Sequence, residues 1–524
     1  MSDTRWKENV KPIYTADFET DPFEHGKRVF PFAAGCYDGR TFAAVWSRAC
    51  AKKLVEYWRK LPPGIIYFHN GGKFDLYYLF PWIEGDLLMI NGRIVSCRIA
   101  GHEVRDSFSI IPIALAKYKK DDIDISKLHR DCREQNRGEI LSYLQGDCVY
   151  LHELVSRFHD EFGDFMTIGS AAMTQLRKFH PFERGNKTLD SDIRKPFFFG
   201  GRVQCFKAGV ISQPFKIFDV NSMYPAVMRN FRHPVSTTPS VRKTISNNTF
   251  FVTAEGRVAG EGAFPTRNRK GGVDFLPGYQ RIHTTIHEFQ AAERLGLFRC
   301  SKILYTYDYE ESMNFDEFVS HFYAARMKAA KNEDKARVIF YKLILNSAYG
   351  KFAQNPERYS DHRITHGARL DEPWMCHTIH EGGKYVVWHK PVQRHSYYNV
   401  SVGASITGAA RAVLMEGLAK AVDPIYCDTD SIICRDLPGV SHGSELGAWK
   451  LEETGDQIAI AGKKLYACFR DGECVKSATK GARIKPHEIV EVANGGTAIY
   501  RSAAPTFRID GSVNFIKRKI RRTV

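Results

Sequence analysis

Two aspartates interrupt an apolar segment near residue 430, and no other feature limits the possible folds of this chain so strongly. The segment runs Pro424-Ile-Tyr-Cys-Asp-Thr-Asp-Ser-Ile-Ile433, so apolar residues flank Asp428 and Asp430 on both sides. Such flanks predict a buried strand, and a buried carboxylate is costly unless a positive charge neutralises it. A metal ion would supply that charge, so the sequence predicts a metal site here.

Two segments upstream have the pattern of further polar groups on a buried framework. A strand-like run ends at Asp219 and is followed by a turn and by a helix that opens near Pro225. Lys342, Asn346 and Tyr349 are spaced i, i+4 and i+7, so they share one face of a helix. Taken singly, a plain strand-to-helix connection or a solvated helix face has the same spacing. The three segments together favour a common site.

The N-terminal part of the chain carries a second set of carboxylates. Asp17 and Glu19 lie two apart in a strand-like run, so both side chains point to one side. Asp75 follows two glycines that let the backbone approach a ligand, and Tyr143 and Asp147 share a helix face. Each piece alone is also typical of a surface acidic pair, an ordinary turn or a solvated helix. Together they supply the four carboxylates and the tyrosine of a two-metal phosphodiesterase, and hard oxygen ligands suit Mg²⁺, with Mn²⁺ as a substitute.

Length and charge bound the class of protein. The 524 residues exceed the usual size of one domain, so two or more domains are expected. Lys and Arg number 75 against 59 Asp and Glu, a net charge of +16 that favours nucleic acid as a partner, with a basic soluble enzyme as the alternative. The twelve cysteines form no CxxC pair, and we expect reduced thiols. We find neither an apolar run of bilayer length nor a signal peptide, and expect a soluble intracellular protein.

Local patterns divide the chain near residue 185. Before it, strand-like and helical runs alternate, which favours an α/β unit. The polar stretch 184–192 is a candidate linker. Residues 322–351 are rich in Ala, Lys, Arg and Leu and free of proline, which predicts one helix that ends at Gly350.

Between residues 355 and 401 the pattern changes to short strand-like runs, with Gly382-Gly383 as a hairpin turn. This predicts an insertion after the helix. The basic segment 517–522 is more typical of a solvated tail than of a site, and we place no site there.

The N-terminal motifs resemble those of the DEDD-type 3′-to-5′ proofreading exonucleases in their tyrosine-containing form. The resemblance implies that the metal ligands are Asp17, Glu19, Asp75 and Asp147. Tyr143 would orient the attacking water and Lys120 would stabilise charge in the transition state. Contacts to the single-stranded 3′ end are implied for Thr20, Asn70, Phe74, Ser107 and Phe108, the last standing where leucine is usual.

The later motifs resemble motifs A, B and C of the family B DNA polymerases, in that order. The resemblance implies that Asp219, Val220 and Asp428 hold two Mg²⁺ ions for in-line transfer, with Asp430 as a supporting acid near the primer terminus. Lys342 would neutralise charge on the phosphates, while Asn346 and Tyr349 would shape the pocket of the nascent base pair. Tyr224 would pack under the sugar and exclude a 2′ hydroxyl, which makes dNTPs the substrate.

Further matches to that family lie on both sides of these motifs. Lys464, Tyr466 and Lys476 resemble elements that grip the primer strand. Phe198-Phe199-Gly200-Gly201 resembles the YxGG element that contacts DNA between the exonuclease and polymerase modules, with phenylalanine in place of tyrosine.

The resemblance implies an α/β and α+β multidomain fold. An RNase H-like exonuclease domain would span residues 1–185 and a right-hand polymerase domain residues 186–524. Within the second, we expect a palm with an insertion at about 270–317, fingers at about 322–352, an insertion at about 355–400, palm to about 440 and a thumb at about 441–524.

Within family B, the chain is most similar to the protein-primed subgroup of phages with linear genomes, of the tectivirus type. His69 to Asp75 and Asp219 to Pro225 carry this likeness. It implies a terminal protein that primes synthesis and contacts the first insertion, and a second insertion that encloses the template and supports strand displacement. The implied partners are template and primer DNA, dNTPs, the terminal protein and a single-stranded DNA-binding protein.

The same likeness implies a monomer in the cytoplasm of a bacterial host. Three alternatives stay open: a family B polymerase that extends ordinary DNA primers, an exonuclease with a degenerate polymerase module, and a catalytically silent nucleic-acid-binding scaffold. All seven expected carboxylates are present, which argues against the scaffold.

Overall fold

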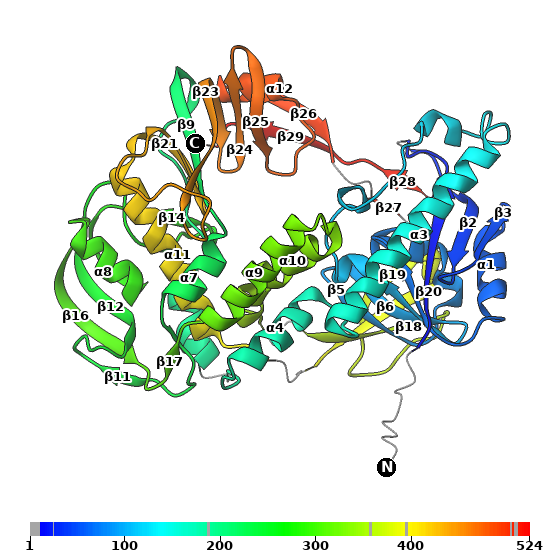
Figure 1. The fold of residues 1–524 in the computed structure, drawn as a ribbon, viewed down its shortest axis with the longest axis horizontal. Coiled ribbons are helices and arrows are strands. Elements are labelled where there is room, and N and C mark those ends of the chain that lie inside the picture. Colours follow the sequence, from blue (N-terminus) through cyan, green and yellow to red (C-terminus); the bar gives the residue numbers. More distant parts are fainter. Residues whose placement is uncertain are drawn as a thin grey trace.

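The computed structural model describes residues 11–24, 26–185, 189–355, 359–392, 397–502, 506–507 and 512–523. Figure 1 shows the N-terminal unit around α3 (Arg137–Phe162) on one side and the sheet of β9 (Gly209–Val220) on the other. Helices α9 (Asp316–Lys331) and α10 (Lys335–Phe352) lie between them. In the described part of the chain, no helix is long and apolar enough to cross a bilayer.

The N-terminal unit is built on a mixed sheet. Strand β1 (Ile13–Thr20) pairs in parallel with β4 (Ile65–Phe68), and β4 pairs in parallel with β7 (His102–Asp106). Helix α3 lies across β1 and β2, and its buried face includes Leu144, Cys148 and Leu151, one helical turn apart. The other elements of this unit are β2 (Pro31–Tyr37), β3 (Phe42–Trp46), β5 (Asp86–Ile90), β6 (Arg93–Ile99), α1 (Cys50–Trp58), α2 (Asp75–Tyr78) and α4 (Ile168–Phe179).

The second insertion extends this same sheet. Strand β18 (Ser360–Thr365) pairs with the edge strand β5, so the sheet has ten strands in the order β19-β20-β18-β5-β6-β7-β4-β1-β2-β3. The expected hairpin is confirmed, because β19 (Met375–His380) pairs with β20 (Tyr385–Pro391) across Gly382 and Gly383. Both glycines have positive φ, 64° and 104°, which only glycine adopts without strain.

The second large sheet has seven strands in the order β25-β24-β23-β9-β22-β21-β8. Helix α11 (Val400–Lys420), buried along most of its length, and α7 (Met223–Asn230) pack beside it. The remaining strands are β8 (Val203–Cys205), β21 (Val422–Asp428), β22 (Ser431–Asp436), β23 (Trp449–Gly462), β24 (Leu465–Arg470) and β25 (Glu473–Thr479).

Strands β23, β24 and β25 lie beyond residue 440, where the sequence placed the thumb. They are nevertheless part of the palm sheet, since β23 pairs with β9 along nearly its whole length. A smaller unit follows them, made of α12 (Pro486–Ala493), β26 (Thr497–Arg501) and β29 (Lys517–Arg521). We propose that the thumb begins after Thr479. The basic segment is therefore a paired strand, β29, and not a free tail.

The first insertion is a separate four-stranded sheet in the order β11-β16-β12-β15, with α8 (Ile286–Arg294) against it. It begins near residue 240 and so extends upstream of the expected range of 270–317. Its strands are β11 (Ser240–Arg242), β12 (Thr249–Val258), β15 (Gly278–Thr285) and β16 (Phe298–Asp308). Short pairs flank this sheet: β10 (His233–Pro234) with β17 (Ser312–Met313), and β13 (Pro265–Arg267) with β14 (Val273–Phe275).

The helix predicted for residues 322–351 is two helices, α9 and α10. The chain breaks at Glu333, whose φ is 54°, and Asp334 then caps α10 by accepting a hydrogen bond from the Arg337 amide at 3.1 Å. Gly350 does not end the helix, because α10 continues to Phe352. Composition predicts helix here, but the capping aspartate starts a new one.

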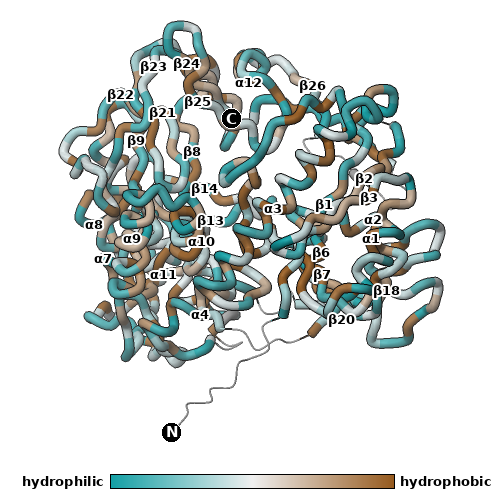
Figure 2. Tube along the Cα trace, turned by 45° about the vertical axis from the view of Figure 1, so that its right-hand side comes forward, coloured by the Kyte–Doolittle hydropathy of each residue, from teal (hydrophilic) through white to brown (hydrophobic). Residues whose placement is uncertain are grey.

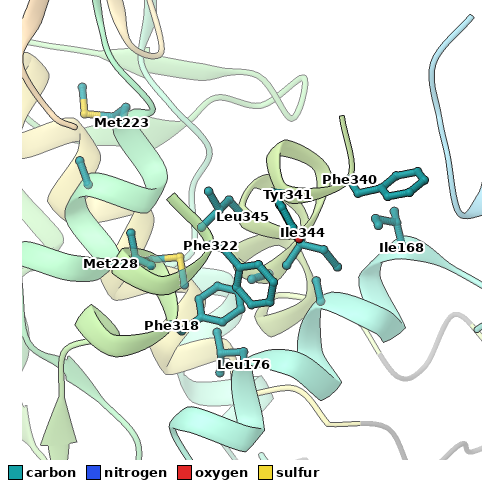
Figure 3. Close-up of a cluster of buried hydrophobic side chains, with 14 of the residues drawn as sticks. Ile168, Leu176, Met223, Met228, Phe318, Phe322, Phe340, Tyr341, Ile344 and Leu345 are labelled. Carbon is teal, nitrogen blue, oxygen red and sulfur yellow. The ribbon is translucent and has the colours of Figure 1, made fainter. Parts of the chain in front are cut away.

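The largest hydrophobic core joins the N-terminal unit to the polymerase part. Figure 3 shows Leu176 of α4 beside Phe318 of α9 and, further along α4, Ile168 beside Phe340 of α10. The candidate linker follows α4, but residues 186–188 lie outside the described part of the chain. Figure 2 shows hydrophobic residues concentrated inside both units and hydrophilic residues on the outer loops.

Candidate active sites

The palm sheet brings its carboxylates together at the end of two strands. Asp219, near the end of β9, lies opposite Ser431, and Ser431 lies opposite Asp428 at the end of β21. Asp430 occupies the turn between β21 and β22, where its carbonyl accepts a hydrogen bond from the Val220 amide at 2.9 Å. The four residues predicted from these motifs line one cavity of about 620 Å³: Asp219, Val220, Asp428 and Asp430.

Buried negative charge dominates this cavity. Burial, followed by repulsion from Asp430 and Glu452, raises the pKa of Asp219 to about 7. Burial and the nearby Asp428 also raise the pKa of Asp430. Asp428 accepts two hydrogen bonds from the Lys464 ammonium, at 2.7 and 2.9 Å. The group therefore favours an added cation.

Helix α10 presents the predicted face to the cavity. Lys342, Asn346 and Tyr349 all line it, and the first two are exposed to solvent. Tyr224, at the start of α7, stacks on Tyr349 with ring centroids 4.0 Å apart and planes 7° apart. The two tyrosine rings thus form one flat side of the cavity.

Gly200 and Gly201 lie close to the turn that carries Asp428 and Asp430. A Cβ on Gly201 would lie 2.7 Å from the Thr429 side chain, so only glycine fits there. The carbonyl of Gly200 accepts a hydrogen bond of 2.8 Å from the Arg411 guanidinium. Arg411 is buried and is paired with the buried Glu288 at 2.7 Å. This ion pair lay outside the sequence analysis because its partners are more than a hundred residues apart.

The predicted primer-gripping residues also reach the cavity. Lys464 and Lys476 line it, and Lys476 is paired with Glu452 at 2.7 Å. Tyr466 is buried, with its ring 5.0 Å from that of Tyr426. Arg326 of α9 lines the cavity too; the sequence analysis missed it because α9 and α10 were taken as one helix.

The N-terminal carboxylates gather between β1, α2 and α3. Glu19, Asp75 and Asp147 are buried, and Asp17 lies beside them on β1. Burial and then repulsion from Asp147 raise the pKa of Asp17 to about 7. Burial and the neighbouring carboxylates raise the pKa values of Glu19 and Asp75 as well. The sequence spacing predicted this grouping, and the structure brings all four together.

Lys120 and Tyr143 lie at the edge of this group. The Lys120 ammonium is 3.3 Å from a carboxylate oxygen of Asp147 and 5.3 Å from the centroid of the Tyr143 ring. Burial raises the pKa of Asp147, although Lys120 opposes that effect. A cation and a hydroxyl therefore stand next to the carboxylate that enters from α3.

The predicted strand-contacting residues surround the same group. Asn70 has a φ of 63°, and a Cβ on Gly72 would lie 2.0 Å from the Ile94 carbonyl oxygen, which explains the two glycines of that turn. The Phe74 ring is 5.0 Å from that of Phe23. Thr20 is buried at the end of β1.

Ser107 and Phe108 complete this wall. The buried Ser107 hydroxyl donates to the Phe68 carbonyl at 3.0 Å, and the Arg93 guanidinium lies 4.6 Å from the Phe108 ring centroid. Arg93 also pairs with the buried Asp106, which accepts a hydrogen bond from the Gly72 amide at 3.1 Å. Asp106 thus fixes the turn and is not part of the carboxylate group.

The donor sets suit hard divalent cations. As placed here, no described group of three or more His, Cys, Asp or Glu side chains is arranged to hold an ion by itself. In the N-terminal group, Oδ1 of Asp147 is buried and has no hydrogen-bond partner among the described residues. A bound cation would satisfy this oxygen. In the palm, two carboxylates match Mg²⁺, which is usually bound by one or two carboxylates plus substrate phosphates.

Comparisons with known proteins agree with this geometry. Residues 116–372 match the family described as DNA polymerase type B, organellar and viral. The DNA-directed DNA polymerase of Enterobacteria phage PRD1 is 44% identical over 547 residues, covering 98% of this chain and 98% of that protein. The chain belongs to the type B DNA polymerases. A probable DNA polymerase of Neurospora intermedia is 27% identical over 67% of this type B polymerase and 38% of its own length.

Solved structures establish the fold of this type B polymerase. Phi29 DNA polymerase complexed with primer-template DNA and incoming nucleotides gives a TM-score of 0.75 at 18% identity, covering 98% of this chain and 100% of that chain. The same enzyme with single-stranded DNA gives 0.75 at 19% identity and the same coverage. The expected fold, an RNase H-like unit followed by a right-hand polymerase, is confirmed.

Proposed function

We propose that this type B DNA polymerase extends a primer in the palm cavity and removes 3′ nucleotides at the N-terminal carboxylates. The observation that carries the proposal is the presence of two separate carboxylate groups, one buried and one half-buried, each with a cationic lysine beside it. Template and primer DNA, dNTPs and a divalent metal ion are the implied ligands, with Mg²⁺ preferred and Mn²⁺ as a substitute.

In the palm, Asp219, Asp428 and the backbone of Val220 would hold the ions. Bound there, Mg²⁺ would lower the charge barrier to attack by the primer hydroxyl on the triphosphate. Lys342 reaches the cavity from α10 and neutralises phosphate charge. Lys464, which bonds to Asp428 in this structure, would contact the primer strand with an ion bound at Asp428. Asp430 stays as a supporting carboxylate near the primer terminus.

The residues that would face the ions would also select dNTPs as the substrate. Tyr224, held by its stacking on Tyr349, would pack under the sugar and exclude a 2′ hydroxyl, which would select dNTPs. Asn346, exposed on the same face of α10, contacts the nascent base pair. Lys476 and Tyr466 hold the primer strand.

At the N-terminal group, Asp17, Glu19, Asp75 and Asp147 would hold the ions that supply an activated water. Tyr143 orients that water, and Lys120 stabilises the negative charge of the transition state. Thr20, Asn70, Phe74, Ser107 and Phe108 bind the single-stranded 3′ end. Gly200 and Gly201 lie where a strand passes between the two units.

The decisive experiment uses one primer-template with and without dNTPs in Mg²⁺. Asp428→Ala should abolish extension and spare degradation, because its site is separate from the N-terminal group. Asp17→Ala should do the reverse. Loss of both activities in either variant, with the fold intact, would contradict the assignment of two sites, and EDTA should stop both reactions in the unaltered chain.

Protein priming is the second part of the proposal. It is supported by the compact chain and by the two insertions, of which the first forms its own sheet beside the palm and the second joins the exonuclease sheet. A terminal protein would supply the hydroxyl that accepts the first nucleotide. If purified polymerase, terminal protein and labelled dNTPs give no protein-linked nucleotide, the enzyme extends ordinary DNA primers instead.

We further propose that the enzyme is a monomer that works in the cytoplasm of a bacterial host, together with a single-stranded DNA-binding protein. It would replicate a linear viral genome with strand displacement.

A further inference from the structure

Three histidines of the second insertion gather in a cavity separate from that of the palm. His362, His377 and His389 line this cavity of about 750 Å³, which lies between the insertion, the β5–β6 turn and the ends of α4 and α10. None of the proposed polymerase or exonuclease roles uses these side chains.

Strand register places two of the rings on one face. His362 of β18 lies directly opposite His389 of β20, and the pair Ile364 and Val387 lies opposite two residues further along. Since side chains two apart on a strand share a face, both histidines continue the buried face that Ile364 and Val387 form. The two rings lie 6.3 Å apart between centroids.

A β-bulge brings the third ring to the same place. The register of β19 against β20 shifts between Cys376 and Thr378, which leaves His377 without a direct partner. Its ring lies 5.4 Å from that of His362 and 5.5 Å from that of His389. Three imidazoles from three neighbouring strands therefore form a triangle.

One nitrogen of this triangle lacks a partner. His362 is only 8% exposed, and its Nδ1 is buried without a hydrogen-bond partner among the described residues. Simple packing of three rings would leave that nitrogen unsatisfied, and an unpaired buried polar group destabilises the folded chain. A ligand that accepts imidazole lone pairs removes this cost.

We propose that His362, His377 and His389 bind a divalent transition metal ion of the Zn²⁺ class. Neutral imidazole suits Zn²⁺, Co²⁺ and Ni²⁺, whereas Mg²⁺ prefers oxygen, so this site differs in kind from the two carboxylate groups. No described trio of His, Cys, Asp or Glu side chains stands at bonding positions, so binding would require a ring to move, and His377 is the exposed one of the three. Three protein ligands leave a fourth position open to the cavity.

The ion would tie the edge strand β19 to β18 across β20. Strand β19 has no other neighbour in the sheet among the described residues, so the insertion is fastened at its free side. The site does not depend on the proposed polymerase or exonuclease mechanism.

The test is metal titration of the purified full-length chain, stripped with EDTA and kept in excess Mg²⁺ to occupy the oxygen sites. Co²⁺ should produce the visible absorption of nitrogen ligation at one equivalent, and Zn²⁺ should displace it. His377→Gln and His389→Gln should each weaken binding by at least about tenfold. His377 is exposed, so its variant keeps the test valid if loss of His389 disturbs folding.

His366→Gln is the matched control, because this histidine lies in the same insertion but bonds to the Ile83 carbonyl at 3.2 Å. It should bind Co²⁺ like the unaltered chain, and Zn²⁺ should raise the melting temperature of both. The proposal is overturned if the unaltered chain shows no saturable nitrogen-ligated ion, or if His377→Gln and His389→Gln bind it as well as His366→Gln. The proposal is also overturned if His377→Gln and His389→Gln change the affinity for DNA but still bind the ion.

Discussion

At the scale of residues, the palm site depends on a close approach between two loops. The Thr429 amide donates a hydrogen bond of 2.7 Å to the Arg202 carbonyl, and Gly201 lies against the Thr429 side chain. Thr429 itself has a φ of 61° and sits between the two aspartates. Any side chain at residue 201 therefore displaces the turn that carries Asp428 and Asp430.

Gly201→Ala should impair primer extension while sparing degradation of single-stranded DNA. The added methyl forces the Thr429 turn to shift, and such overpacking costs about 1–3 kcal/mol. Gly138→Ala is the control, because a Cβ there meets nothing within 4 Å and Gly138 has no proposed role at either site. Single-turnover extension and degradation assays measure both variants. Equal loss of extension in the two variants would show that the close approach is not the cause.

Charge at the N-terminal group gives a second prediction. Asp17→Asn should stabilise the metal-free chain at pH 8, on the order of 4 kcal/mol, because it removes a charge whose burial raises the pKa of Asp17 to about 7. A raised carboxylate pKa destabilises the folded state at every pH above the unfolded pKa of about 4, and the penalty is complete only above the folded value of about 7, so the gain should shrink as the pH falls from 7 toward 4. Mg²⁺ should raise the melting temperature of the unaltered chain more than that of the variant. An Asp17→Asn chain that is less stable in EDTA would contradict this account.

At the scale of elements, the start of α10 is clamped to the end of α3. Arg157 of α3 donates two hydrogen bonds of 2.6 Å to Asp334, the residue that caps α10. Glu161, one turn later on α3, accepts from Arg337 at 3.0 Å and from the Tyr341 hydroxyl at 2.5 Å. The helix that carries Lys342 and Asn346 is thus positioned by the N-terminal unit.

Asp334→Asn should destabilise the chain by about 1 kcal/mol at pH 7, since it removes the charge from an ion pair that is partly exposed to solvent, while Asn keeps the helix cap. Burial alone would raise the pKa of Asp334, but the Arg337 amide and Arg157 hold it below its usual value. A lowered pKa gives stability that is fully present above the unfolded pKa, about 4, and is lost as the pH falls through the folded value. Urea unfolding at pH 7 and at pH 3 should therefore show a difference that disappears in acid. Glu333→Gln, at the exposed neighbouring position, is the control and should change little at either pH.

At the scale of the whole molecule, one hydrophobic core holds both catalytic units. Helix α4 of the N-terminal unit packs against α9 and α10, and the same cluster continues through α7 and α11 to the palm. The ten-stranded sheet adds a second connection, since β18 from the insertion pairs with β5. The two units are therefore expected to unfold together.

Ile344→Ala should cost about 2–5 kcal/mol and lower a single melting transition, because Ile344 is fully buried where α10 meets α4. Extension and degradation should be lost together on heating. Met327→Ala, on the exposed side of α9, should change stability by less than about 0.5 kcal/mol. Calorimetry combined with both assays tests this; two separate transitions, of which only one moves, would show that the core is not shared.

The sequence by itself predicted the two carboxylate groups. Asp17 and Glu19 on a strand, and Lys342 and Asn346 on a helix, share faces because strand and helix periodicity are local properties. The cost of burying Asp428 among apolar residues is likewise local, so the motif predicted the group that the structure shows around the palm cavity. The hairpin at Gly382 was predictable for the same reason.

Only the tertiary structure decided how distant segments meet. Asp86 and Arg363 pair because β5 has a free edge, and nothing in either segment encodes that edge. The extension of the palm sheet by β23 and the burial of Arg411 against Glu288 also depend on long-range pairing. Local spacing fixes which side of an element a residue faces, whereas the partner across that face is chosen by packing of the complete chain.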